Sequence, residues 1–282
     1  MLAVLFWSTS ASAFKVCLSP ERLNVPILSL LLGASLASCA VLFLQLLLSG
    51  KVNSLAKLTK ENFVHSAFLG LLNPFLYYIV LFKSYSLLPA QQAQPLNFVW
   101  PLTLVLLSVL ILKQKIKRRD IMAILISFLG VLIISTGGHL SDFKLTSPLG
   151  VTLAVGSSIP WALYWIYNIK DKLDEVLRLF LNFCFASVYV LILILLTGRL
   201  ETPGLKGIIG VTYVGLFEMG ITFLLWLKAL KLSKTTAHIA NLIFLVPFMS
   251  LVVVHFVIGE TILLSTIIGL VFIIGGIIFQ RL

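Results

Sequence analysis

The feature that most constrains the fold is a succession of apolar stretches, each about 20 residues long, separated by short polar connections. A helix of about 20 residues rises about 30 Å, which is the thickness of a membrane's hydrocarbon core. Only 11% of the residues are charged, against about 25% in soluble domains. The apolar runs are continuous and do not alternate as in barrel strands. We therefore predict an all-α integral membrane protein with ten transmembrane helices. They lie at residues 1–14, 26–48, 63–82, 91–112, 120–137, 148–169, 176–197, 207–227, 236–258 and 261–280.

The first stretch, residues 1–14, is short and ends in Ser10-Ala11-Ser12-Ala13, which faintly resembles a signal-peptide cleavage site. No positive charge precedes it, and a signal peptide needs one. We therefore interpret it as a membrane helix, although 14 residues rise only about 21 Å. Two explanations of the short span stay open: a natural start further upstream, or a helix that is partly re-entrant.

Positive charge predicts the orientation. Of the 21 Lys and Arg residues, 15 lie in the even-numbered connections and the C-terminus and six in the odd-numbered connections. Because cytoplasmic loops are enriched in Lys and Arg, both termini are expected in the cytoplasm. The net charge of +11 is explained by this rule, so we predict no nucleic-acid partner. The predicted location is the cell inner (plasma) membrane, which the chain crosses many times in contact with the lipid bilayer.

An internal repeat is visible at an offset of about 145 residues. Residues 81–87 resemble residues 226–232, Gly70 corresponds to Gly215, and Pro101 corresponds to Pro247. Each unit holds five predicted spans, and because five is odd the second unit enters the membrane from the opposite side. We predict two inverted-topology five-helix repeats, residues 1–140 and 141–282, which form one transport domain. In secondary transporters this arrangement places the substrate site between the halves near the midplane.

The stretch Gln94–Leu102 is unusual for a lipid-facing helix, because it contains two prolines, an Asn and a Trp. Proline removes a backbone hydrogen bond and bends a helix, and the freed groups must face protein or a water-lined cavity. The bend either serves helix packing or lines a substrate pathway, and we favour the pathway. Four prolines are predicted to line or gate it: Pro74, Pro101, Pro160 and Pro247.

Aromatic residues lie at similar depths in several spans. Trp and Tyr offer flat apolar contact with one polar atom, and their faces attract organic cations. The alternative is the aromatic belt at the membrane interface, which we favour for Trp226 because it lies beside Lys228. For the residues further inside their spans we favour a substrate cavity: Trp7, Tyr78, Trp100, Trp161 and Tyr164.

Three polar residues within spans are further candidates for substrate binding. Asn97 and Asn241 could bind an ammonium or carboxylate group, or equally could hold neighbouring helices together. Glu218 is the one carboxylate in the middle of a predicted span. Burial favours its protonated form, so Glu218 could carry a proton on the pathway, or could pair structurally with a neighbouring helix.

The sequence contains no metal-binding spacing, no Gly-rich phosphate loop and no room for a nucleotide-binding domain. We expect no metal, no cofactor and no catalytic residue, and we predict that the protein is not an enzyme. An ATP-driven pump on this chain is excluded, so energy must come from a gradient, a partner chain or the flow of substrate.

Short motifs carry a family resemblance over essentially the whole chain. Residues 5–9 (LFWST), 82–85 (FKSY) and the prolines of the fourth and ninth spans resemble the EamA-type transporters of the drug/metabolite transporter superfamily. Residues 97–103 (NFVWPLT) and 161–164 (WALY) are similar to runs in the bacterial aromatic amino-acid exporters. The resemblance implies alternating access around a central cavity formed by spans one, three, four, six, eight and nine.

We therefore expect a secondary transporter of amino acids or related small amphipathic metabolites, with export implied by the resemblance. The alternative is efflux of aromatic or cationic drugs by the same fold. The partner is a small-molecule substrate, and the sequence leaves both a monomer and a dimer open.

Overall fold

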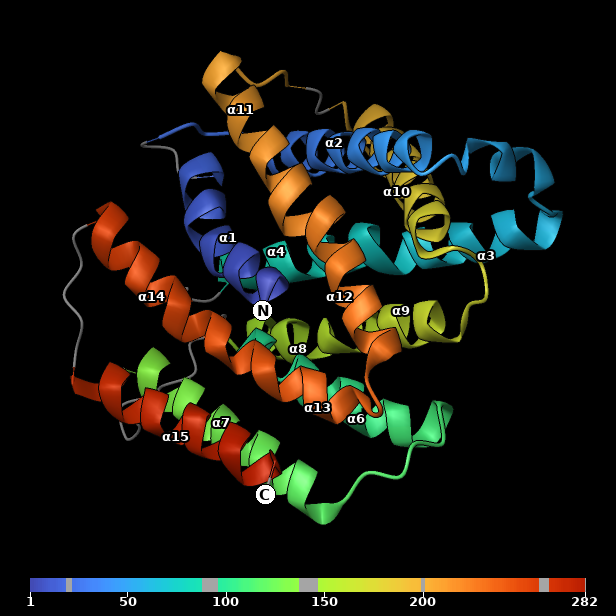
Figure 1. Cartoon of the computed structure of the whole chain (residues 1–282). Coiled ribbons are helices and arrows are strands. Elements are labelled where there is room, and N and C mark those ends of the chain that lie inside the picture. Colours follow the sequence, from blue (N-terminus) through green and yellow to red (C-terminus); the bar gives the residue numbers. More distant parts are fainter. Residues whose placement is uncertain (19–21, 88–95, 137–146, 199–200, 259–263, 282) are drawn as a thin grey trace.

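The computed structural model describes residues 1–18, 22–87, 96–136, 147–198, 201–258 and 264–281, and every regular element in these ranges is a helix (Figure 1). Gln94 and Pro95, which open the stretch that we singled out above, lie outside the described residues, as do residues 88–93. Helix α1 runs over Leu2–Leu18, so it continues four residues beyond the predicted end at residue 14.

The first half of the chain continues with α2 and ends with α7. Its elements are α2 (Ile27–Leu48), the 3₁₀ helix η1 (Val52–Lys57), α3 (Lys60–Gly70), the π-helical turn η2 (Leu71–Leu76), α4 (Tyr77–Leu87), α6 (Trp100–Ile111) and α7 (Arg118–Ser135).

The second half has the same alternation of long and interrupted helices. Its elements are α8 (Pro148–Gly156), α9 (Ser158–Lys170), α10 (Glu175–Thr197), α11 (Leu205–Tyr213), the π-helical turn η4 (Val214–Gly220), α12 (Ile221–Leu232), α13 (Thr236–Ala240), the 3₁₀ turn η5 (Asn241–Phe244), α14 (Leu245–Ile258) and α15 (Leu264–Arg281).

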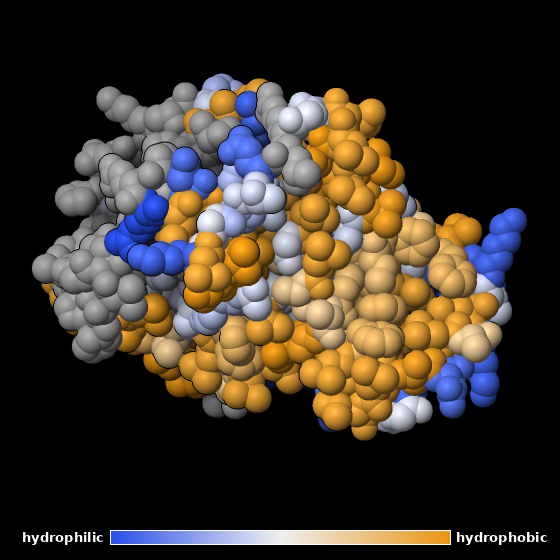
Figure 2. All heavy atoms as spheres, turned by 90° about the horizontal axis from the view of Figure 1, so that it is seen from above, coloured by the Kyte–Doolittle hydropathy of each residue, from blue (hydrophilic) through white to orange (hydrophobic). Residues whose placement is uncertain are grey.

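Within the described ranges, five helical stretches are long and apolar enough to cross a membrane: Ile27–Leu48, Lys60–Leu81, Pro148–Lys170, Glu175–Thr197 and Leu205–Leu232. Shorter apolar helices, such as Trp100–Ile111, accompany them. Figure 2 shows that apolar residues cover much of the described surface on one face, while hydrophilic residues gather at the end where Figure 1 places the α2–α3 connection and again toward the opposite side. Leu48, Leu196 and Leu205 are each more than three-quarters exposed. Exposing such a large apolar surface to water is unfavourable in free energy, so this surface faces the lipid, as expected of a multi-pass membrane protein.

Local sequence explains where the helices begin. Thr59 precedes α3 and accepts a hydrogen bond from the backbone N–H of Asn62, whose side chain in turn accepts one from the backbone N–H of Thr59. Asp174 precedes α10 and accepts from the backbone N–H groups of its first turn. Partial burial of Asp174 raises its pKa, but these N–H groups and the paired Lys51 ammonium outweigh burial and hold the pKa below its usual value.

Each of the four predicted prolines lies at a departure from regular α-helix. Pro74 lies in η2, where Asn73 has an extended backbone (φ −156°, ψ 130°). Pro101 lies in the first turn of α6, directly after a break at residues 98–99. Pro160 follows the α8–α9 junction, and Pro247 follows η5. A proline lacks the N–H that would continue the preceding helix, which explains these positions.

Close helix crossings occur at glycines in both halves. A Cβ atom on Gly70 would lie 2.5 Å from the carbonyl oxygen of Asn182 on α10. A Cβ atom on Gly215, in η4, would lie 2.5 Å from the carbonyl oxygen of Ala34 on α2. The absence of a side chain therefore lets α3 approach α10 and η4 approach α2 at backbone distance. Helices α7 and α15 lie side by side at one edge of the molecule (Figure 1).

Candidate substrate site

Four tryptophans from four different helices meet in the interior. They are Trp7 of α1, Trp100 of α6, Trp161 of α9 and Trp226 of α12. The ring centroid of Trp7 lies 6.5, 6.1 and 5.2 Å from those of Trp100, Trp161 and Trp226. Trp100 lies 5.7 Å from both Trp161 and Trp226. All four rings are buried. We call these four residues the tryptophan cluster; three of them are the tryptophans that we predicted for the cavity.

Further aromatic rings extend the tryptophan cluster toward α4 and α10. Tyr77 lies 4.4 Å from Trp161, measured between ring centroids, and 4.9 Å from Tyr78. Trp165 lies 5.6 Å from Trp161. Phe223 lies 5.6 Å from Trp161 and 5.0 Å from Trp165. The predicted residue Tyr164 lies 5.0 Å from Trp165, so it belongs to this outer layer.

Glu218 lies beside the tryptophan cluster, on the π-helical turn η4, and is buried. The hydroxyl of Tyr78 donates a hydrogen bond of 2.8 Å to its Oε1 atom. Trp7 Nε1 donates a hydrogen bond of 2.9 Å to the backbone carbonyl oxygen of Glu218. A π turn interrupts the regular ladder of helical hydrogen bonds, which suits a carbonyl that bonds a side chain from another helix. Three of the predicted site residues, Trp7, Tyr78 and Glu218, are therefore joined directly.

Several polar atoms around the tryptophan cluster have no hydrogen-bond partner among the described residues. They are Oε2 of Glu218 and the Nε1 atoms of Trp161, Trp165 and Trp226. A buried indole N–H usually finds a partner, and leaving one unpaired costs about 1–3 kcal/mol. One carboxylate oxygen and three indole N–H groups are therefore unpaired within the described residues.

The two candidate asparagines lie in different surroundings. Asn97 is buried, and its Nδ2 donates to the Tyr77 hydroxyl at 3.3 Å and to Ser157 Oγ at 3.4 Å, which places it next to the outer layer. Asn241 Nδ2 instead donates to Oε1 of Gln280 on α15 at 3.2 Å. The structure therefore brings Asn97 to the site, while the described contact of Asn241 joins two helices.

Trp226 corrects one prediction. Because Trp226 lies beside Lys228 in the sequence, we predicted that it belongs to the aromatic belt at the membrane interface. Its side chain is instead only 2% exposed and lies against Trp7 and Trp100. Trp165 and Phe223 were not singled out in the sequence. Both lie one helical turn from a cluster tryptophan, at i+4 from Trp161 and i−3 from Trp226, and this spacing puts them on the same helix faces.

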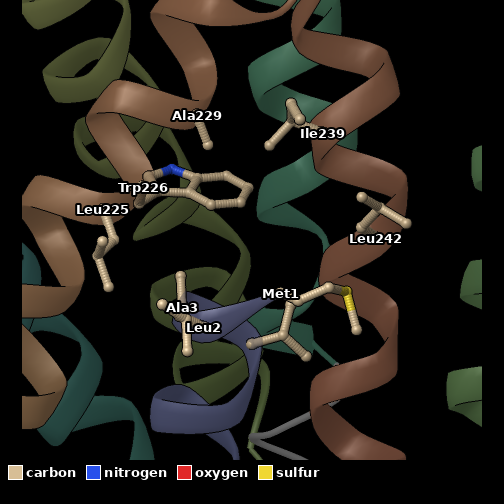
Figure 3. Close-up of a pocket in the computed structure, with 9 residues that line it drawn as sticks. Met1, Leu2, Ala3, Leu225, Trp226, Ala229, Ile239 and Leu242 are labelled. Carbon is tan, nitrogen blue, oxygen red and sulfur yellow. The ribbon is translucent and has the colours of Figure 1, made fainter.

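A pocket of about 300 Å³ reaches one side of the tryptophan cluster. It lies between the N-terminal turn of α1, helix α12 and the α13–η5 segment, and its lining is mostly apolar. Figure 3 shows the Trp226 ring facing this space, opposite Leu242 and above Met1. In the described part of the chain, no three His, Cys, Asp or Glu side chains lie together as a metal site would require.

A family model and several relatives match this chain. The profile of the EamA-like transporter family matches residues 1–136 and again residues 148–281. An uncharacterized transporter of Clostridium kluyveri is 32% identical over 175 residues, which cover 59% of this chain and 55% of that protein. The uncharacterized transporter YvbV of Bacillus subtilis is 26% identical over 74% of this chain and 68% of its own length.

Two further matches extend the comparison. An uncharacterized transporter of Acidianus ambivalens is 29% identical over 68% of this chain and 72% of its own length. A protein of known crystal structure superposes with a TM-score of 0.81 over 99% of this chain and 93% of its own, at 20% identity. At that identity the superposition shows a shared fold.

Proposed function

The chain belongs to the EamA-like transporter family, and from that premise we propose that the tryptophan cluster is the substrate site of a secondary transporter. The substrates are amino acids or related small amphipathic metabolites, which the protein exports by alternating access. The observation that carries this proposal is the set of unpaired polar atoms around the buried rings.

The unpaired atoms match the two ends of a zwitterion. Oε2 of Glu218 can accept hydrogen bonds from an ammonium group, and the three free indole N–H groups can donate to a carboxylate. The ring faces supply flat apolar contact for a side chain. The rings now touch one another, so a substrate bound between them must separate them. Substrate binding is thereby tied to movement of the four helices that carry the tryptophans.

The proposed architecture is ten transmembrane helices in two inverted repeats, residues 1–140 and 141–282. Paired contacts support it. Gly70 and Gly215, 145 residues apart, occupy corresponding crossings, α3 on α10 and η4 on α2. Cys39 and Cys184, also 145 residues apart, approach each other with their Sγ atoms at 3.7 Å. Equivalent contacts between residues about 145 positions apart are expected when two similar halves are related by a pseudo-twofold axis.

The proposed orientation places both termini in the cytoplasm of an inner (plasma) membrane protein. The pocket beside the first turn of α1 borders Trp226. Pro74, Pro101, Pro160 and Pro247 are proposed to provide the bends at which helix segments tilt when the site changes sides.

Counterflow in proteoliposomes tests the proposal. The vesicles are loaded with unlabelled tryptophan, phenylalanine or threonine, and entry of labelled tryptophan is followed. We expect saturable entry that aromatic amino acids stimulate. Trp100→Ala should raise the half-saturating concentration about tenfold or more, as expected for a buried anchor residue. Leu110→Ala is the matched control, because Leu110 is on the same helix and 72% exposed. Equal effects of the two substitutions would contradict the site assignment.

Trp100→Phe accompanies these variants, because it keeps an aromatic ring and is the milder change for folding. Efflux of aromatic or cationic drugs is the second candidate, and the aromatic faces next to a carboxylate favour it. Counterflow of a quaternary ammonium dye, with no stimulation by any amino acid, would establish this candidate in place of the first.

A further inference from the structure

Glu218 differs from the other buried acids in the described part of the chain. Asp171 lies 2.7 Å from Arg178 Nη2 and 2.9 Å from His65 Nδ1. Asp120 lies 3.6 Å from His238 Nε2. Glu218 has no Lys, Arg or His partner among the described residues. Its Oε1 atom accepts a hydrogen bond from the Tyr78 hydroxyl, and the Ser10 side chain of α1 also lies next to the carboxyl group.

The helices around η4 supply no compensating cation within the described residues. Helices α1, α2, α11 and α12 pack against η4. Their described titratable side chains make no hydrogen bond or ion pair with Glu218: Cys17, Cys39, Lys206, Tyr213, Lys228 and Lys231. Lys231 pairs with Glu175, and the Tyr213 hydroxyl donates to Thr9. From α4, Tyr78 is the titratable group in contact with Glu218.

An isolated carboxylate at membrane depth costs several kcal/mol, so the group must be neutralised in every stable state. Two species can do this: a proton bound to the carboxyl group, or a cation held next to it. The hydrogen bond from Tyr78 occupies Oε1 in both cases and leaves Oε2 free. A proton and an ammonium group therefore compete for the same oxygen.

We propose that Glu218 binds either a proton or the ammonium group of the substrate, so that each substrate molecule crosses the membrane in exchange for a proton. When substrate binds, the carboxylic acid gives its proton to water on the open side, and the carboxylate pairs with the ammonium group. When substrate leaves on the other side, a proton from that side replaces it. This proposal rests on the proposed function, because it uses the same site.

The neighbouring rings fit the role. Trp7 holds the backbone of Glu218 through the 2.9 Å hydrogen bond, and its ring lies 5.2 Å from the Trp226 ring. The faces of these indoles attract a cation that approaches the carboxylate. A substrate without a positive charge gains neither interaction, and it cannot displace the proton. The exchange is therefore selective for amines and quaternary ammonium compounds.

The experiment uses the full chain in proteoliposomes, with protein-free vesicles as the blank. The probes are labelled tryptophan and, in parallel, a quaternary ammonium dye. Counterflow is measured with equal pH on both sides, and it tests the site alone. Uptake into vesicles with an acidic interior, with no probe gradient at the start, tests proton exchange. A pH-sensitive dye inside the vesicles reports whether protons leave as the probe enters.

We expect the wild-type protein to accumulate probe and release protons. Glu218→Gln should abolish this accumulation and weaken probe binding about 30-fold or more, since one member of a buried charge pair is lost. Glu218→Asp keeps a carboxyl group, and we expect it to retain accumulation at a lower rate. The exposed Glu61 on α3 provides the matched control, and Glu61→Gln should behave as wild type.

Each other outcome overturns a stated part of the argument. Saturable counterflow without pH-driven accumulation in the wild type would overturn proton exchange and leave the proposed function in place. Accumulation that persists in Glu218→Gln would overturn the role of Glu218. Absence of counterflow for both probes would overturn the proposed function, and this inference with it.

Discussion

Trp161→Phe separates the polar role of the tryptophan cluster from its packing role. Among the described residues, the Trp161 ring has five aromatic neighbours at centroid distances between 4.4 and 6.1 Å, and phenylalanine keeps an aromatic ring among them. The substitution removes the unpaired Nε1 donor. A hydrogen bond to a charged group contributes about 1.5–3 kcal/mol, which corresponds to roughly a 10- to 150-fold change in affinity.

The assay is calorimetric titration of the purified protein in detergent with two ligands. Tryptophan carries a carboxylate, and tryptamine is the same molecule without it. We expect Trp161→Phe to weaken tryptophan binding 10-fold or more by the estimate above and to change tryptamine binding much less. Phe223→Leu is the control, because Phe223 lies 5.6 Å from the same ring and has no polar side-chain atom. It should weaken both ligands alike. Equal losses for both ligands in Trp161→Phe would refute a bond from this indole to the carboxylate.

Three further perturbations test other parts of the structure. Gly130→Leu would place a Cβ atom 2.5 Å from a carbonyl oxygen of α15. It should destabilise the α7–α15 contact by about 1–3 kcal/mol and lower the melting temperature in detergent. Gly156→Ala should not lower it, because the space around Gly156 is open. The pKa of Asp174 is lower in the folded protein than in the unfolded chain, so its ionised carboxylate stabilises the folded state. This stabilisation is complete above the unfolded-state pKa, which is about 4, and is lost as the pH falls through the folded-state pKa. Asp174→Asn keeps the helix cap but loses the ion pair with Lys51, so it should lower the free energy of unfolding by about 0.2–1 kcal/mol at pH 7. The difference in melting temperature between the variant and the wild type should become smaller toward pH 3. Tyr78→Phe removes a hydrogen-bond donor to the buried carboxylate, and by the same estimate it should weaken tryptamine binding about 10-fold or more in the same titration. An unchanged affinity would mean that this hydrogen bond contributes nothing to the charged form of Glu218.

Much of the fold could be predicted because the bilayer imposes simple rules. Long apolar runs predicted helices, and the described part of the chain confirms an all-helical membrane protein, with five stretches there that are long enough to span. The positions of Pro74 and Pro160 predicted interruptions, since a missing N–H has the same local effect wherever it occurs. The end of α1 was misjudged by four residues, because a sequence pattern locates helix ends less precisely than it locates helices.

The site was predictable in part. Trp7, Trp100 and Trp161 could be identified by their depth in separate spans, and the structure brings them together. Trp226 was placed wrongly because sequence gives its depth along the helix but not the face on which it lies. For Asn241, substrate binding and a contact between helices were equally open, and its bond to Gln280 of α15 is a contact that the sequence does not reveal. The depth of a residue along its helix follows from counting residues, whereas the direction in which its side chain points follows only from tertiary contacts.

The α7–α15 pair lies at one edge of the molecule, and none of the rings of the tryptophan cluster comes from it. Its requirement is for small residues, such as Gly130 and Gly276, where the two backbones meet. A relative could therefore exchange every residue of the proposed substrate site and keep this pair unaltered. For protein engineering, the lipid-facing side of α15, where Val271 is 65% exposed, offers a place for a spectroscopic label that reports on helix movement without touching the transported molecule.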